Sequence, residues 1–482
     1  MDNLTREQIE SVLNGLGLGE GDIVLLHSSL ASLGQVDGGT ETVIQAFLNL
    51  IGRKGTLVVP TFGALGAITE TLKKRPDAVH SLHPKASVAA VGAAAETICQ
   101  DHWKAETAHG LDTPYQRIAD LGGYVCLLGV DQDRNTTLHT VEERLRLPYL
   151  STTAEVTFKT PQGPVTRSWS LFPGPHRDFC QLDRPLRDAG IVRIAQLGSA
   201  VVRLMKSADL IEFCLSLGRR RPDFVLCDNP ACADCVAQRA ALRRARYATA
   251  SFRVAAAASL AGRYAEEMAD ACQATGITRL ELDQLRGLPL SLLPSAALAQ
   301  AVASLRARHI EVSALRLSGV GDAFTRLLDA AADLEVRRLV MPLSDRAAHD
   351  TDQAQARGVH LSFVNRALMH GVVSDLLLAL RARHPQASFT FSPADFALVG
   401  EKPFLTSYRN RLRRFIDQVD LEDGLFDGTP TELTRGNGEI KEIVSILSAC
   451  SFSGWLVLGP RNRAAGGLPA AVAAFDRLLD TL

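Results

Sequence analysis

The chain has 482 residues, of which 46% are hydrophobic, a length and composition that predict two or three domains with substantial cores. Its formal net charge is −1, so it lacks the basic excess of a nucleic-acid-binding protein and no nucleic-acid partner is expected. Because the sequence has no apolar run of 18 residues, no signal-peptide core near its start and nine scattered cysteines, we expect no membrane association and a reducing, cytoplasmic location.

The first motif is an apolar strand, DIVLL, followed by His27, Ser28, Ser29 and Leu30. A hydroxyl-rich turn that leads into a helix presents backbone N–H groups, which suit a phosphate or pyrophosphate. An ordinary helix cap is the alternative interpretation of this turn. Gly38-Gly39-Thr40 predicts a second turn and a second helix start.

Three further motifs follow in order. They are GTLVVPTFG at 55–63, HSLHPKASVAAVGAAAE at 80–96 and HGLDTPYQRI at 109–118. The first ends a strand at Pro60-Thr61, and the second contains Ser87 and Val88. Taken alone, such segments predict an α/β domain with a polar cleft.

The most informative stretch is 125–144, VCLLGVDQDRNTTLHTVEER. An apolar strand is followed by a polar turn and a helix that Asn135, Thr136 or Thr137 can cap. His139 falls in the first turn, and Glu142 shares its face because residues three apart are neighbours on a helix. Open α/β sheets place ligands at such strand ends, where a carboxylate-held histidine can act as a general base. An exposed surface pair is the alternative.

Five motifs in this order resemble the aminoglycoside 3-N-acetyltransferase family, the non-GNAT antibiotic acetyltransferases, over about residues 4–235. The resemblance implies acetyl-CoA as co-substrate and an amine acceptor in an amino sugar, an aminoglycoside or a related natural product. It also implies direct attack on the thioester without an acyl-enzyme, so no active-site cysteine is expected.

The resemblance further implies a role for individual residues. His139 would be the catalytic base and Glu142 its orienting partner. Backbone N–H groups near Thr61 are candidate donors to the thioester oxyanion. The residues expected to contact the coenzyme are His27, Ser28, Ser29, Leu30, Thr61, Ser87 and Val88.

The acceptor site is harder to predict. Glu106 and Asp112, near the HGLDTP motif, are the candidate acceptor contacts. The loop at 63–85 contains Glu70 and Asp77 but also a basic run at 73–75, so it is not strongly acidic. A polycationic aminoglycoside and a monoamine therefore both remain candidates.

The second half, after a helical connector at 236–250, alternates strand-like and helical patterns. Eight such strands predict a (β/α)₈ barrel. We therefore expect two domains, an acetyltransferase-like α/β domain at 1–240 and a barrel at 250–482. The strand candidates are 252–259, 277–283, 310–318, 336–344, 359–365, 387–393, 416–422 and 454–459.

This half resembles the xylose-isomerase-like (β/α)₈ barrels, best at 418–459, with Gly436 to Ile440 and the Ser-Gly-Trp before the last strand. That family usually holds a divalent metal at strand C-termini, but most of its ligands are absent here. The corresponding positions are Val364-Asn365, Ser392 to Asp395, Asp420 and Gly459. Asp395, Asp420 and Asp423 could form another hard-cation site. We favour the alternative, in which these three residues are polar groups left in a barrel mouth that no longer binds a metal.

A cysteine cluster, Cys227-x₄-Cys232-x₂-Cys235, ends the first half. Two cysteines at x₂ spacing suit zinc, and a structural site needs four ligands. Cys180 or Cys214 could supply the fourth only if the fold brings it near the cluster. Thiols packed in a loop without metal are the alternative.

Three functions follow from these patterns. The first is an acetyl-CoA-dependent amine N-acetyltransferase that carries a catalytically inactive barrel. The second is a bifunctional enzyme whose barrel isomerises or epimerises a sugar, and the third is a non-catalytic binding protein. The two-part organisation is also compatible with a homodimer.

Overall fold

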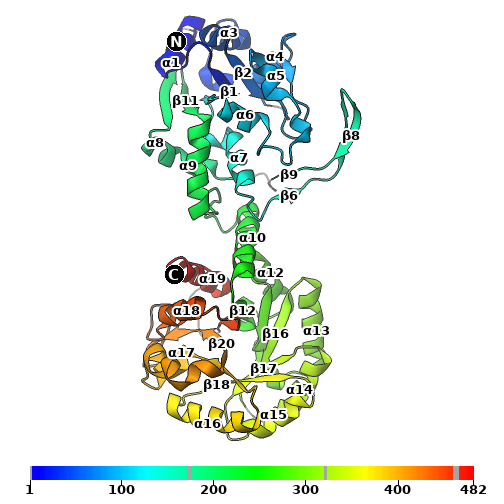
Figure 1. Ribbon diagram of the computed structural model, residues 1–482, viewed down its shortest axis with the longest axis vertical. Coiled ribbons are helices and arrows are strands. Elements are labelled where there is room, and N and C mark those ends of the chain that lie inside the picture. Colours follow the sequence, from blue (N-terminus) through cyan, green and yellow to red (C-terminus); the bar gives the residue numbers. More distant parts are fainter. Residues whose placement is uncertain (1–2, 64, 172–175, 320–322, 460–465) are drawn as a thin grey trace. The chain divides into compact units, whose positions relative to one another are not determined.

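The computed structural model describes residues 3–63, 65–171, 176–319, 323–459 and 466–482. The chain divides into two compact units, Met1–Gln238 and Arg239–Leu482. The division falls inside the helix α10 (Ala233–Thr249), which contains most of the connector at 236–250 (Figure 1). Within the described ranges, no helix is long and apolar enough to cross a membrane.

The first unit is built on a mixed, seven-stranded sheet in its described part (Figure 1). Its three central strands run parallel, and their side chains are almost entirely buried, which explains their continuous apolar sequence. The outer strands pair antiparallel. In spatial order the strands are β10 (Val192–Leu197), β11 (Ala200–Lys206), β5 (Tyr124–Leu128), β1 (Ile23–Ser28), β2 (Thr56–Pro60), β4 (Val88–Gly92) and β3 (Val79–His80).

Helices pack on this sheet and enclose an apolar core that includes Ile9, Phe47 and Leu128. The first helix begins with a capping box between Thr5 and Gln8, which satisfies its first backbone N–H groups. The helices are α1 (Arg6–Gly15), α2 (Leu30–Leu33), α3 (Gly39–Ile51), α4 (Ala67–Leu72), α5 (Ala95–Cys99), α6 (Pro114–Asp120), α7 (Thr137–Arg144), α8 (Asp183–Asp188) and α9 (Ser207–Arg220).

Two chain segments meet at the carboxyl ends of β1 and β5. The strands are paired in parallel as far as Ser28 and Leu128, and the Ser29 N–H donates to the Leu128 carbonyl at 2.9 Å. Gly129 follows with φ +69°, where a Cβ would lie 2.8 Å from Ser32. The glycine thus lets the turn after β1 approach the segment that leads into α7.

The helix after β5 is present as predicted, but its cap is not. α7 begins at Thr137 and is preceded by Thr136, whose side chain makes no capping hydrogen bond. The side-chain amide of Asn135 instead donates to Gln132 at 2.9 Å. The first N–H groups of the helix donate instead to the backbone of the preceding turn, from Leu138 to the Asn135 carbonyl and from His139 to the Thr136 carbonyl.

A twisted ribbon follows α7. It consists of the strands β6 (Ser151–Thr152), β7 (Val156–Thr160), β8 (Gly163–Arg167) and β9 (Ser170–Leu171), paired β6 with β9 and β7 with β8. β7 and β8 form an antiparallel hairpin (Figure 1), in which half-buried and exposed residues alternate. The next described residue after β9 is His176, which precedes the 3₁₀ turn Phe179–Leu182.

The second unit is a closed barrel of eight parallel strands, which confirms the predicted (β/α)₈ fold. All eight predicted strand segments are strands, with ends shortened by up to two residues. Phe363, Phe389 and Phe391 are among the buried side chains of its core. The strands are β12 (Arg253–Ala257), β13 (Arg279–Leu282), β16 (Glu311–Arg316), β17 (Arg338–Pro342), β18 (His360–Val364), β19 (Ser388–Phe391), β20 (Ile416–Leu421) and β23 (Trp455–Leu458).

Helices and two short hairpins connect these strands. The hairpins pair β14 (Gln284–Leu285) with β15 (Leu288–Pro289) and β21 (Asp423–Gly424) with β22 (Pro430–Thr431). The helices are α11 (Ala258–Ala261), α12 (Ala265–Thr275), α13 (Ser295–Ala307), α14 (Ala323–Asp333), α15 (Ala347–Gln355), α16 (His370–Arg383), α17 (Pro393–Leu398), α18 (Ile440–Ala449) and α19 (Gly467–Leu479).

Candidate active site

A cavity of about 830 Å³ opens where the turn after β1 faces the start of α7. Its volume lies within the range of small-molecule sites. The described residues that line it come from five segments, the turn after β1, the chain between β2 and α4, the loop before β4, the HGLDTP loop and the β5–α7 connection. They include His27, Ser28, Ser29, Leu30, Phe62, Lys85, His109, Asp133, Arg134, Asn135, Thr136 and His139.

His139 and Glu142 form the pair that their spacing predicts. Nδ1 of His139 lies 2.7 Å from Oε2 of Glu142, and His139 lines the cavity. The imidazole retains 15% exposure, whereas the Glu142 side chain has none. A surface ion pair is therefore excluded as the interpretation of this motif. Because the carboxylate accepts from Nδ1–H, Nε2 is the nitrogen that carries the basic lone pair.

The second oxygen of Glu142 has two partners that sequence reasoning missed. Oε1 accepts from Nε of Arg177 at 2.7 Å and from the hydroxyl of Tyr149 at 2.9 Å. The Arg177 guanidinium also lies over the Tyr149 ring. Arg177 lies 35 residues from Glu142 in the sequence. Tyr149 lies only seven residues away, just beyond the end of α7, but no helical or strand spacing links it to Glu142. The carboxylate is thus fixed on both sides before any substrate binds.

The protonation states of this pair follow from burial and charge. Burial lowers the pKa of His139 to about 4, against the raising effect of its hydrogen bond to Glu142. Burial alone would raise the pKa of Glu142, but His139 and Arg177 hold it below the usual value. At neutral pH the pair is therefore a neutral imidazole beside a carboxylate, the form required of a general base.

A second histidine–carboxylate pair lies next to the first. Nδ1 of His109 is 3.2 Å from Oε1 of Glu143, and the His109 backbone N–H donates to Oε2 at 2.7 Å. The rings of His109 and His139 have centroids 5.4 Å apart, and both residues line the cavity. His109 is not among the site residues predicted from the sequence. Its place in the HGLDTP motif, together with the Glu142-Glu143 doublet, was the available signal.

The predicted coenzyme turn lies at the cavity, from His27 to Leu30. His27 is buried at the end of β1, and burial lowers its pKa to about 3, so its ring is neutral. Among the described residues, Nε2 of His27 and Oδ1 of Asn135 are buried without a hydrogen-bond partner. Because buried polar atoms are nearly always paired, these two atoms at a cavity wall are suited to contact a ligand.

The other predicted coenzyme residues, Thr61, Ser87 and Val88, are not among the described residues that line the cavity. The hydroxyl of Thr61 donates to that of Ser87 at 2.8 Å, and the Thr61 N–H donates to the Ser87 carbonyl. That N–H is therefore already used and is not available to an oxyanion in this conformation. Val88 is fully buried within the sheet. Roles for these three residues stay predictions.

The predicted acceptor residues, Glu106 and Asp112, are both exposed and neither belongs to the described lining. Glu106 pairs with Arg146 on the surface. The acidic residues of the preceding loop are also paired, Glu70 with Lys73 and Asp77 with Arg75. Within the described part of the chain, Glu106 and Asp112 therefore make no interaction that connects them with the cavity.

The charge at the cavity is more cationic than acidic. Lys85 and Arg134 line it together with one carboxylate among the described residues, Asp133. Nε of Arg134 lies 3.2 Å from that carboxylate, so part of its charge is locally balanced. The exposed rim therefore favours an anionic ligand group over an extended polycation.

The mouth of the barrel contains a buried cation instead of an open carboxylate cluster. Arg316, at the end of β16, donates to Asp420 at 2.8 Å and also pairs with Glu281. Burial alone would lower the pKa of Arg316, but these carboxylates raise it. The carboxylate of Asp423 accepts from the Gly436 and Gly438 backbone N–H groups. Two of the three predicted oxygen ligands are thus engaged by the protein itself.

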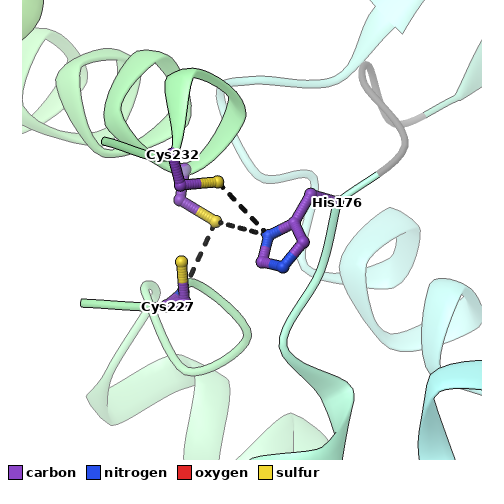
Figure 2. A group of neighbouring side chains, drawn as sticks. His176, Cys227 and Cys232 are labelled. Atoms are coloured by element: carbon purple, nitrogen blue, oxygen red, sulfur yellow. Dashed lines mark hydrogen bonds between the residues drawn. The ribbon is translucent and has the colours of Figure 1, made fainter. Parts of the chain in front are cut away.

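The three clustered cysteines do lie together, and His176 joins them. Their donor atoms all lie within 4.8 Å of one another, and Figure 2 shows the His176 ring directed at the thiol groups. The predicted fourth partners are wrong, because Cys214 is buried in α9 and Cys180 is an exposed residue, and neither belongs to this group. His176 was not predicted as a member of the cluster, because it lies 51 residues before the first cysteine.

Comparison with known proteins identifies the first unit. Residues 25–64 and 63–217 match the family model described as aminoglycoside 3-N-acetyltransferase. Aminoglycoside N(3)-acetyltransferase VII of Streptomyces paromomycinus is 30% identical over 279 residues, which cover 45% of this chain and 94% of the relative. Aminoglycoside N(3)-acetyltransferase VIII of Streptomyces fradiae is 31% identical over 265 residues, covering 44% and 90%.

A solved structure, that of the aminoglycoside acetyltransferase AAC(3)-IVa, aligns at 27% identity and a TM-score of 0.46, covering 51% of this chain and 98% of that one. The two Streptomyces relatives are covered almost completely and at 30% identity or above. The chain therefore belongs to the aminoglycoside 3-N-acetyltransferase family and is an acyl-CoA-dependent amine N-acyltransferase.

Proposed function

We propose that this protein transfers the acetyl group of acetyl-CoA to an amine of an amino sugar, an aminoglycoside or a related natural product, with His139 as the base. The observation that carries the proposal is the His139–Glu142–Arg177 arrangement at the wall of an 830 Å³ cavity. Burial keeps His139 neutral, so it can accept a proton without first losing one.

The reaction needs one proton transfer in each direction. The acceptor nitrogen attacks the thioester carbonyl, forming the C–N bond, while an N–H proton passes to Nε2 of His139. The C–S bond then breaks, and the imidazolium returns the proton to the departing thiolate. The products are an amide and free CoA thiol, and Glu142 favours the transient imidazolium by its charge. A positioned base of this kind contributes roughly 10²–10⁴ in rate.

Coenzyme binding is proposed for the turn from His27 to Leu30. This turn supplies small hydroxyl groups and a buried, unpartnered imidazole nitrogen at the cavity. Lys85 and Arg134 add positive charge to the same lining, which matches the phosphates of CoA. Thr61, Ser87 and Val88 would contribute indirectly, by fixing the end of β2 against β4.

The names of the relatives favour an aminoglycoside acceptor, and with it a role in antibiotic resistance. The cavity lining itself is not rich in carboxylates, since Asp133 pairs with Arg134. We therefore propose an acceptor that presents one amine to His139 and places few other charges inside the cavity. Glu106 and Asp112 would contact such an acceptor only at its exposed end.

For residues 250–482 we propose a xylose-isomerase-like barrel that no longer carries out metal-dependent isomerisation or epimerisation. The guanidinium of Arg316 is a cation held between Glu281 and Asp420 at the carboxyl ends of the strands. Carboxylates engaged in this way are not available as metal ligands. The bifunctional alternative requires metal binding that is lost when Asp395 and Asp420 are substituted.

The proposal is tested by measuring thiol release from acetyl-CoA against a panel of aminoglycosides and simple amino sugars. Turnover with one class of acceptor would establish the reaction and its acceptor. Coenzyme binding without turnover on any amine would favour the non-catalytic binding protein. Failure to bind acetyl-CoA at all would remove the basis for the assigned cavity.

A further inference from the structure

A second cluster of reactive side chains lies in the first unit, outside the lining of the catalytic cavity. It consists of His176, Cys227, Cys232 and Cys235, which come from two segments of the chain. The three cysteines follow residue 217, where the match to the acetyltransferase family ends. No step of the proposed acyl transfer uses any of them.

The distances within the cluster fit a tetrahedral metal site. Nδ1 of His176 lies 3.3 Å from Sγ of Cys235 and 3.4 Å from Sγ of Cys232. Around zinc, with Zn–S near 2.3 Å and Zn–N near 2.0 Å, tetrahedral geometry separates sulfur and nitrogen by about 3.5 Å. Side chains that merely pack in a loop have no reason to converge at this spacing.

The chain around the cysteines also favours thiolates. Cys232 immediately precedes α10 and Cys235 lies in its first turn, where the positive end of the helix dipole stabilises negative charge. The Cys227 backbone N–H points at Sγ of Cys235 at 3.4 Å, a contact that would stabilise a sulfur ligand. His176 is exposed and Cys227 and Cys232 are partly exposed, so an ion has a path to the site.

We propose that the first unit binds one structural Zn²⁺ through Nδ1 of His176 and the Sγ atoms of Cys227, Cys232 and Cys235, and that this ion positions Arg177. Binding releases the three thiol protons and leaves a site of net charge −1. A closed set of three cysteines and one histidine is typical of structural zinc, not of catalytic zinc.

The connection to the catalytic pair is short. Arg177 is the residue next to His176 in the chain, and its Nη1 donates to the His176 carbonyl at 2.7 Å. Its Nε donates to Glu142, which in turn holds His139. Fixing His176 to the cysteine cluster therefore fixes the backbone from which Arg177 reaches Glu142. This coupling rests on the proposed function, whereas the zinc site itself does not.

The metal content of the full-length protein tests the site directly. Wild type, His176→Ala, His176→Cys and Cys232→Ser are purified under reducing conditions, and zinc is measured by mass spectrometry. We expect about one zinc per chain in wild type and in His176→Cys, which restores a four-ligand set. His176→Ala and Cys232→Ser should lose most of it. Cys180→Ser, outside the cluster, is the matched control and should keep its zinc.

A second measurement keeps the test valid if a variant fails to fold. Cobalt replaces zinc in the wild-type protein, and tetrahedral thiolate ligation gives intense visible bands that an octahedral oxygen site lacks. Wild type that contains no zinc and develops no such bands would overturn the proposal. Equal zinc loss in Cys180→Ser and Cys232→Ser would do the same.

The positioning role has its own readout. His176→Ala should lower kcat about tenfold with an unchanged Kd for CoA, since loss of an outer supporting residue typically costs 10–100-fold, and His176→Cys should recover both zinc and kcat. If His176→Ala loses zinc but keeps its kcat, the proposed positioning of Arg177 is wrong, while the proposed zinc site still stands. A wild type that binds zinc but acetylates no amine would refute the proposed function and leave the metal site intact.

Discussion

Arg177 and Glu142 form a buried ion pair, with Nε of Arg177 2.7 Å from Oε1 of Glu142, and both side chains are almost fully buried. Arg177 thus contacts one carboxylate oxygen of Glu142, Oε1, and His139 contacts the other, Oε2. The carboxylate cannot rotate without breaking both contacts. The imidazole is therefore held in one tautomer and one orientation toward the cavity.

Substituting Arg177 should impair both stability and turnover. Arg177→Met leaves Glu142 buried with one charged partner removed, which typically costs about 3–5 kcal/mol of unfolding free energy. Arg177→Lys retains the charge but cannot reach Glu142 and the His176 carbonyl together, so kcat should fall while stability falls less. Denaturant unfolding and steady-state kinetics measure the two effects.

The matched control for this substitution is Arg184→Met, which removes an exposed arginine paired with Asp188. Exposed pairs contribute little to stability, so this variant should behave like wild type. Similar losses in the two variants would show that the buried pair has no special role.

The pH dependence of the reaction should follow the acceptor, not His139. Because burial lowers the pKa of His139 to about 4, its basic form is fully present at neutral pH and is lost only as pH falls through that value. The acceptor amine, with a pKa near that of an ordinary amine, is largely protonated there. kcat/KM should therefore rise with pH, and its inflection should move when an acceptor of different amine pKa is used.

An inflection between about pH 5 and 7 that is the same for two such acceptors would contradict this account, since it would match an ordinary imidazole. The comparison needs only the pH profile of kcat/KM for both acceptors with the wild-type protein.

The cations at the cavity should contribute to coenzyme affinity. Lys85→Met and Arg134→Met should each raise KM for acetyl-CoA several-fold with little change in kcat, because an exposed charge pair contributes about 1 kcal/mol in water. The effect should shrink at high salt, where exposed charges are screened. Lys74→Met is the control, since Lys74 is an exposed lysine between α4 and β3 that does not line the cavity, and an equal effect there would refute a specific role.

Arg316 should be important for the stability of the barrel. Arg316→Met leaves Glu281 and Asp420 buried together without their cation, a change that typically costs about 3–5 kcal/mol. Replacing the two carboxylates by leucine in the same variant should recover much of that loss. Denaturant unfolding measures both, with Arg308→Met, which breaks a more exposed pair with Asp270, as control. Unchanged stability in Arg316→Met would refute the structural role.

The local parts of the site could be predicted from the sequence. His139 and Glu142 are three residues apart, and helical geometry alone brings them together. The barrel strands were also predictable, because apolar runs such as the one ending at Val364 recur at regular spacing between helical patterns. The start of α7 could not be predicted correctly, because backbone carbonyls of the preceding turn accept the hydrogen bonds that a side-chain cap was expected to accept.

The remaining parts depend on contacts between distant segments. Arg177 reaches Glu142 across 35 residues, and Arg316 reaches Asp420 across 104. Neither arginine stands in a pattern that names its partner. His176 is similar, because three cysteines predicted a metal site but not which distant side chain completes it. For Arg316, the available signal was a charged residue at the end of an apolar strand, which indicates a buried charge that needs a partner.

The assignment of His139 as the base of an amine acetyltransferase can be tested by measuring thiol release from acetyl-CoA with wild type, His139→Ala and the exposed-histidine control His80→Ala. We predict turnover with an aminoglycoside or amino sugar, a loss of about 10²–10⁴ in kcat for His139→Ala with CoA binding retained, and no change for His80→Ala. Turnover by His139→Ala at the wild-type rate would show that His139 is not the base.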